Sequence, residues 1–182
     1  MNTSGEFINE EANTASHELG HILGLEHRDA AGTSLLTTPS PFNGNDRGFS
    51  SAAEVAVLDA ILGTQVVFLD FALGPPELVL PHPSVGFADA QVLHDYGISG
   101  AVAIQNAINS IVENITADYL GPWLNGAAFS FHTSYATALA AAGNNPASFS
   151  TVAFLGLVPE PGLVWLLLAG GLALRAGRRR GH

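Results

Sequence analysis

The chain has 182 residues and no cysteine, which favours one domain and excludes disulfide scaffolds, thiolate nucleophiles and zinc sites built from sulfur. Residues 1–174 hold two arginines and sixteen carboxylates, a net charge of −14, and the chain has no lysine. This acidity argues against nucleic acid as a partner, because phosphate binding needs a basic face.

The first ten residues, MNTSGEFINE, have neither the basic segment nor the apolar stretch of a secretory signal. The first predicted element is a helix over residues 10–23. Asn9 is its expected N-cap, and Glu10 and Glu11 suit the positive end of the helix dipole. The apolar face expected to pack on the core consists of Ala12, Ala15, Leu19, Ile22 and Leu23.

Residues 17–27, HELGHILGLEH, place three histidines around the end of this helix. His17 and His21 lie four residues apart, so both imidazoles project from one helix face and can bind the same ion. Gly24 lets the chain leave the helix in a left-handed conformation, and His27 then returns as a third ligand. Three nitrogen ligands with an open fourth position are typical of a catalytic zinc site.

Glu18 lies about 100° further round the helix than His17, where its carboxylate can reach a water on the ion but not the ion itself. The pattern H-E-x-x-H-x-x-G-x-x-H resembles that of the metzincin zinc peptidases, and NTASHELGHILGLEH followed by Asp29 resembles their matrixin-type members. The resemblance implies that Zn²⁺ is held by His17, His21 and His27. It also implies that Glu18 is the general base, which takes a proton from the zinc-bound water during peptide hydrolysis.

Metzincins also have a methionine-containing turn beneath the metal, and here the chain departs from the family pattern. Its only methionine is Met1, and residues 32–39 (GTSLLTTP) occupy the expected place of the turn. Leu35 or Leu36 would supply the same apolar floor. Because the methionine is not a ligand, the departure bears on activity more than on metal binding.

A second helix is predicted over residues 52–62, with Gly63 ending it, and it matches the helix that closes a metzincin domain. Its apolar residues at helical spacing are Val55, Leu58, Ile61 and Leu62. A metzincin domain opens with a twisted sheet and a long helix, and sixteen residues before the motif cannot hold them.

The rest of the chain offers candidates for these missing parts. Residues 66–71 (VVFLDF) predict a buried strand, and residues 72–98 predict a loop rich in proline and glycine. A long helix is predicted over residues 100–120, with Ser99 as its cap. Its apolar stripe consists of Ile104, Ile108, Ile111 and Ile115.

Further strands are predicted over residues 129–133 and 151–155, around an alanine-rich segment at 136–142. Strand, long helix, strand, strand is the order of the missing N-terminal half of a metzincin. Three accounts fit this order: a circularly permuted domain, a truncated peptidase followed by the start of a second copy, or an unrelated accessory domain.

The C-terminal tail has an uncharged apolar stretch, residues 162–174, followed by four arginines in the last eight positions. As a helix the stretch spans about 20 Å, short of a hydrocarbon core of roughly 30 Å, and residues 176–177 extend it only if Arg175 snorkels. One interpretation is a buried core helix. The other is a membrane segment whose arginine cluster marks the cytoplasmic side.

Val158-Pro159-Glu160-Pro161, the apolar stretch and the arginines together resemble the PEP-CTERM sorting signal of Gram-negative envelope proteins. The resemblance implies a transient inner-membrane anchor through residues 162–177 and processing by an exosortase-type enzyme. It implies delivery to the cell envelope or the extracellular matrix. Such proteins also carry an N-terminal signal peptide, whose absence here suggests a misplaced start or a truncated or rearranged gene.

These patterns predict an α+β fold with a metzincin-like catalytic helix and C-terminal subdomain, a small sheet, a long helix and a C-terminal transmembrane helix. The expected parts are a zinc-site half (1–64), a strand-helix-strand region (65–157) and a sorting segment (158–182). The predicted function is that of a zinc-dependent metalloendopeptidase acting on protein or peptide substrates.

Two alternatives remain: a catalytically inactive envelope protein that retains the zinc-binding helix, and a gene fragment. The first alternative and the peptidase differ on whether residues 66–71 place an edge strand beside residues 10–23. An extended substrate would pair with such a strand by strand addition.

Overall fold

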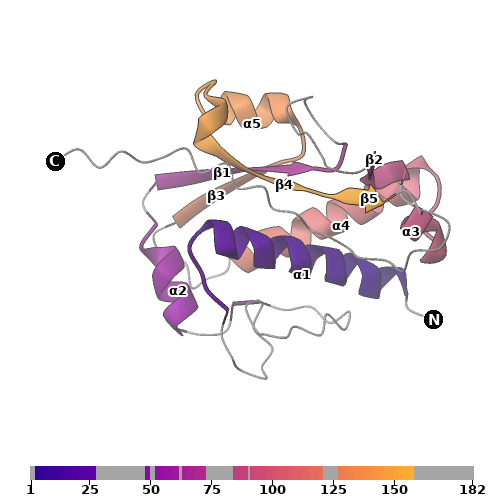
Figure 1. Cartoon of the computed structure of the whole chain (residues 1–182), viewed down its shortest axis with the longest axis horizontal. Helices are drawn as coiled ribbons and strands as arrows, with labels where there is room; N and C mark the ends of the chain where they lie inside the picture. The colour runs from indigo at the N-terminus through magenta and orange to yellow at the C-terminus, as the bar shows by residue number, and fades with distance from the viewer. Residues whose placement is uncertain are drawn as a thin grey trace.

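The described residues form an α+β fold with five α-helices and a three-stranded parallel sheet (Figure 1). This computed structural model describes residues 3–27, 48–49, 52–61, 63–72, 84–89, 91–120 and 127–157. The expected Met-turn equivalent at 32–39 and the expected transmembrane helix and sorting segment at 158–182 lie outside these ranges. Within them, no helix has the length and apolar character needed to span a membrane.

Helix α1 (Ser4–Ile22) carries the histidine motif and begins earlier than the sequence pattern predicted. Its N-cap is Thr3, not Asn9. The Thr3 hydroxyl accepts the backbone N–H of Glu6, while the Glu6 carboxylate accepts the backbone N–H of Thr3. This capping box satisfies two N–H groups that the helix end leaves unpaired. Asn9 lies inside the helix, where its side-chain oxygen instead accepts a hydrogen bond from Asn114.

Helix α4 (Ala101–Tyr119) confirms the predicted long helix and packs against α1. Its isoleucine stripe points into the core, where Ile111 and Ile115 are completely buried. The expected Ser99 cap is wrong, because the N-cap residue is Gly100 with φ 81°. The chain enters α4 through a positive φ, which glycine adopts at little cost.

The sheet has the order β3-β1-β4, and both pairings are parallel. Its strands are β1 (Gly63–Asp70), β3 (Ala127–His132) and β4 (Phe149–Ala153). Val67 and Leu69 of β1 join the core formed with α1 and α4. Val66 and Phe68 point the other way and join a smaller cluster beneath helix α5 (Tyr135–Ala141). Helices on both faces explain why VVFLDF is almost continuously apolar (Figure 1).

Strand β1 is the central strand of this sheet, so residues 66–71 do not provide an edge strand beside α1. Its two neighbours, β3 and β4, are the edge strands among those that the structure describes. Of these, β4 contacts α1. The sheet therefore lies against the histidine-bearing helix, but the strand expected at its edge is in its middle.

Helix α2 (Ala52–Asp59) confirms the predicted second helix, although it ends three residues before position 62. The prediction of a plain loop over 72–98 is wrong. This stretch contains β2 (Ser84–Gly86), which pairs antiparallel with β5 (Leu155–Leu157), followed by a 3₁₀ turn (Phe87–Asp89) and helix α3 (Gln91–Asp95). A second 3₁₀ turn (Pro146–Ser148) precedes β4.

The short elements after β1 are stabilised by burial of aromatic and aliphatic side chains. Their sequences show no helix or strand periodicity. The Phe71 and Phe154 rings stack 4.1 Å apart, and Phe87 packs edge-on against Phe71 at 5.3 Å. Leu93 and Ile98 are buried in the same core. Contacts of this kind between distant segments leave no local pattern to read, which is why the elements were not predicted.

Two neighbouring carboxyls on α1 have raised pKa values. Burial, and secondarily the Glu6 carboxylate, raise the pKa of Glu10. Burial, and secondarily the Glu10 carboxylate, raise the pKa of Glu11 to about 7 from an ordinary 4.5. The folded protein therefore keeps the Glu11 proton at pH values where the unfolded chain has lost it.

We expect Glu11 to make the free energy of unfolding fall as pH rises from 4.5 and to level off above about 7. Glu11→Gln removes this contribution, so the variant is more stable than the wild type above pH 7. Urea unfolding at a series of pH values measures the difference. Glu113→Gln, which neutralises an exposed carboxylate on α4, is the matched control. A Glu11→Gln variant with the pH dependence of the wild type contradicts the prediction.

Candidate metal centre

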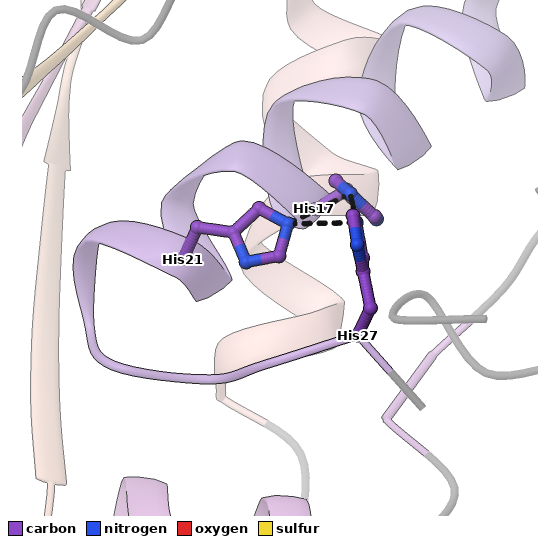
Figure 2. Close-up of side chains that lie close together, drawn as sticks. All are labelled: His17, His21 and His27. Carbon is purple, nitrogen blue, oxygen red and sulfur yellow. Dashed lines mark hydrogen bonds between the residues drawn. The ribbon is translucent and has the colours of Figure 1, made fainter. Parts of the chain in front are cut away.

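The structure brings His17, His21 and His27 together at the C-terminal end of α1 (Figure 2). The Nε2 atoms of each pair lie 3.0 Å apart. His17 is buried, His21 is half-buried and His27 is exposed. The cluster is thus anchored in the protein on one side and reaches solvent on the other, and it can hold a metal ion.

Hydrogen bonding at His21 determines which of its nitrogens can bind a metal. Its Nδ1 lies 2.9 Å from the Leu25 carbonyl oxygen. A carbonyl only accepts, so Nδ1 carries the proton and the Nε2 of the neutral ring presents a lone pair. A histidine that binds a metal through Nε2 needs this tautomer, and the hydrogen bond to Leu25 holds the ring in place.

The three nitrogens fit a zinc ion better than they fit a hydrogen-bonded triangle. Each imidazole nitrogen either donates or accepts, so three mutual approaches of 3.0 Å cannot all be hydrogen bonds. Nitrogens bound at roughly 2.0–2.1 Å to one tetrahedral zinc lie about 3.3 Å from each other. The observed spacing is close to that value, and a cation satisfies all three lone pairs at once.

The end of α1 explains why His27 returns to the cluster. Gly24 has φ 96°, and its N–H donates to the His21 carbonyl at 3.0 Å. The Leu25 N–H donates to the Gly20 carbonyl at 2.9 Å. These two bonds form a Schellman motif, which reverses the chain. Leu25 is buried in the core, so the turn is fixed and His27 follows it at a set position.

Glu18 follows His17 on α1 and is half-buried. The described cluster of ligand atoms consists of the three histidines, and the role of Glu18 as general base stays a prediction. Leu35 and Leu36, the expected apolar floor, lie outside the described part of the chain.

The sequence pattern does not predict two hydrogen bonds formed by Ser16, the residue before His17. The Ser16 hydroxyl donates to Asp118, and the Tyr119 hydroxyl donates to the Ser16 carbonyl. These partners lie 102 and 103 residues apart in the sequence. No local spacing signals such a contact.

Comparison with protein-family models, with curated proteins and with solved structures found no match for this chain. The geometry of the three histidines therefore carries the functional argument, together with the motif in which they lie.

We expect Gly24→Ala to destabilise the protein by about 1–2 kcal/mol, because the positive φ of 96° is strained for any residue with a Cβ. Among the described residues, none beyond the two chain neighbours has an atom within 4 Å of the added Cβ, so the expected loss arises from the backbone conformation. Metal affinity falls as well, since the same turn positions His27. Chemical denaturation and zinc titration measure the two effects.

Gly5→Ala is the matched control, because it makes the same change at the other end of α1. There the one contact of the added Cβ with described atoms outside the adjacent residues and the local helix backbone is the Thr3 hydroxyl oxygen, at 3.9 Å, and alanine favours the helix by about 0.5 kcal/mol. The two substitutions should change stability in opposite directions. A neutral Gly24→Ala would show that the turn does not depend on the left-handed conformation.

Proposed function

We propose that this protein is a zinc-dependent metalloendopeptidase that hydrolyses peptide bonds in protein or peptide substrates. The observation that carries the proposal is the convergence of three histidine Nε2 atoms, each pair 3.0 Å apart, on a site whose third member is exposed. A bound Zn²⁺ supplies Lewis-acid polarisation of a scissile carbonyl and lowers the pKa of water.

The protein's own residues divide the remaining work. His17, His21 and His27 hold the ion through Nε2, and the Leu25 carbonyl fixes the tautomer of His21. Glu18 acts as general base: its carboxylate takes a proton from the attacking water and returns it to the leaving amine. The H-E-x-x-H pattern, in which Glu18 directly follows His17, supports that role.

The shared core supports a single catalytic domain with its parts in an unusual order. Leu19 of α1 and Leu58 of α2 belong to the same buried cluster as Ile111 and Ile115 of α4. Residues 63–157 contribute the parallel sheet and the long helix α4 to this core. Of the three accounts of this order, the common core favours a circularly permuted domain.

A second candidate is a surface protein that binds zinc without hydrolysing peptides. The central place of β1 favours it, because the expected edge strand for pairing an extended substrate is not formed by residues 66–71. Both candidates bind zinc, so only a cleavage assay separates them.

We expect the full-length protein to bind about one zinc per chain, as three histidine ligands imply. Glu18→Gln should keep the metal and lower casein or gelatin cleavage by at least about 100-fold, because it removes only the general base. Metal analysis and a cleavage assay on the same samples measure both quantities.

Two variants control for this experiment. His21→Ala should lose zinc and cleavage together, and Glu26→Gln, which changes an exposed carboxylate in the same motif, should keep both. Cleavage by Glu18→Gln equal to that of the wild type would contradict the mechanism. A wild type that binds zinc and cleaves nothing would favour the second candidate.

We also propose that the protein is sorted to the cell envelope or extracellular matrix by an exosortase-type enzyme. The sequence of residues 158–182 supports this proposal. Residues 162–177 would form a transient inner-membrane anchor, with the arginine cluster on the cytoplasmic side.

Replacing Arg178, Arg179 and Arg180 by glutamine should change the fraction of the protein that is found in the membrane, as measured by cell fractionation. Arg47→Gln is the control, and an unchanged distribution of the triple variant would contradict the anchor.

A further inference from the structure

Ser16, the residue before His17, is held by the last turn of α4. It is completely buried, and its hydroxyl donates to Asp118 Oδ2 at 2.6 Å. This distance is typical of a hydrogen bond to an ionised carboxylate, which is stronger than one between neutral groups. The side chain of Ser16 is therefore fixed to α4 at one point.

Tyr119 holds the backbone of the same residue. Its hydroxyl donates to the Ser16 carbonyl at 2.7 Å, and the side chain is completely buried. Burial, and secondarily the Asp118 carboxylate, raise the pKa of Tyr119 well above its ordinary value, so the hydroxyl stays a donor. Asp118 and Tyr119 of α4 thus form hydrogen bonds with the hydroxyl and the carbonyl of Ser16 of α1.

Ring contacts also fix the position of the Tyr119 side chain. The Tyr119 ring packs against Phe129 of β3 at 4.9 Å and against Phe49 at 5.0 Å between ring centroids. The position of Ser16 therefore depends on Tyr119 of α4 and, through Tyr119, on Phe129 of β3 and on Phe49, and not only on the local helix.

The gripped residue lies at the start of the turn that carries the metal-binding histidines. Ser16 directly precedes His17, and the carbonyl of Ser16 is the one that an α-helix pairs with the N–H of Gly20. Gly20 in turn accepts the Leu25 N–H that closes the end of the helix. A shift at Ser16 would thus move His17 directly and the return of His27 through the helix end.

A second hydrogen bond between the same helices provides a contrast. Asn114 of α4 donates to Asn9 of α1 at 2.9 Å. Asn9 lies eight residues before His17, a rise of about 12 Å along the helix. This contact joins the two helices without touching the turn that bears the histidines.

We propose that Asp118 and Tyr119 are positioning residues that set the spacing of the three histidine nitrogens through Ser16. The metal affinity of the histidines at positions 17, 21 and 27 then depends on α4, about a hundred residues further along the chain. The inference rests on the proposed metal centre, and it makes residues 63–157 a working part of that centre rather than an accessory region.

The test compares Tyr119→Phe and Ser16→Ala with Asn114→Ala in the full-length protein. Tyr119→Phe removes the hydroxyl that donates to the Ser16 carbonyl, and Ser16→Ala removes the hydroxyl that donates to Asp118. Asn114→Ala removes a hydrogen bond between the same two helices at a point away from the histidines. Zinc affinity is measured by competition with a chromophoric chelator, and the Co²⁺-loaded protein gives an absorption spectrum sensitive to ligand geometry. Circular dichroism and urea unfolding of the metal-free variants give their folding and stability.

We expect Tyr119→Phe and Ser16→Ala to weaken zinc binding by about tenfold, the lower end of the effect of groups that orient metal ligands. Their Co²⁺ spectra should differ from that of the wild type, while Asn114→Ala keeps the wild-type affinity and spectrum at a comparable loss of stability. If Tyr119→Phe does not fold, Ser16→Ala alone decides, because it deletes a single oxygen.

Two results overturn the inference, and they are distinguishable. A wild type that binds zinc, with variants whose affinity and Co²⁺ spectra match those of Asn114→Ala, overturns the positioning role and leaves the metal centre intact. A wild type that binds neither zinc nor Co²⁺ overturns the metal centre and the inference together.

Discussion

The packing of α1 against α4 is the contact on which the rest of this structure depends. Helix α1 carries two of the three histidines, and its buried face has no partner of comparable length among the described elements other than α4. Apolar burial along this interface supplies the attraction, and two groups of hydrogen bonds set the register. A metal site whose nitrogens must converge within about 3 Å needs a helix that neither slides nor rotates.

The site itself combines a rigid part and a returning part. His17 and His21 are fixed by the helix, while His27 is brought back by the Schellman turn at Gly24 and the burial of Leu25. The Leu25 carbonyl also holds His21 in the tautomer that presents Nε2. One short turn therefore positions His27 and also holds the tautomer of His21, so the three-histidine cluster is built within eleven residues of the chain.

The remaining architecture places a two-sided sheet behind this helix pair. Strand β1 is covered by α1 and α4 on one face and by α5 on the other, so its side chains are apolar in both directions. The parallel crossovers need helices between the strands, and α4 serves as one crossover while it also supports α1. Helix α4, which connects β1 to β3, is thus also the helix that packs against the histidine-bearing helix α1.

The sequence by itself determined the local features of the protein. The spacing of His17 and His21 and the left-handed glycine at 24 follow from helix geometry, and the isoleucine stripe follows from burial of one face. The sequence also contains the signal for the start of α1, because Thr3 and Glu6 form a capping box within four consecutive residues. Only the tertiary structure decided that β1 is central, that Phe87 and Leu93 order a loop-like stretch, and that Asp118 and Tyr119 grip Ser16. These outcomes depend on which surfaces are buried together, and segments a hundred residues apart share no periodicity that would reveal it.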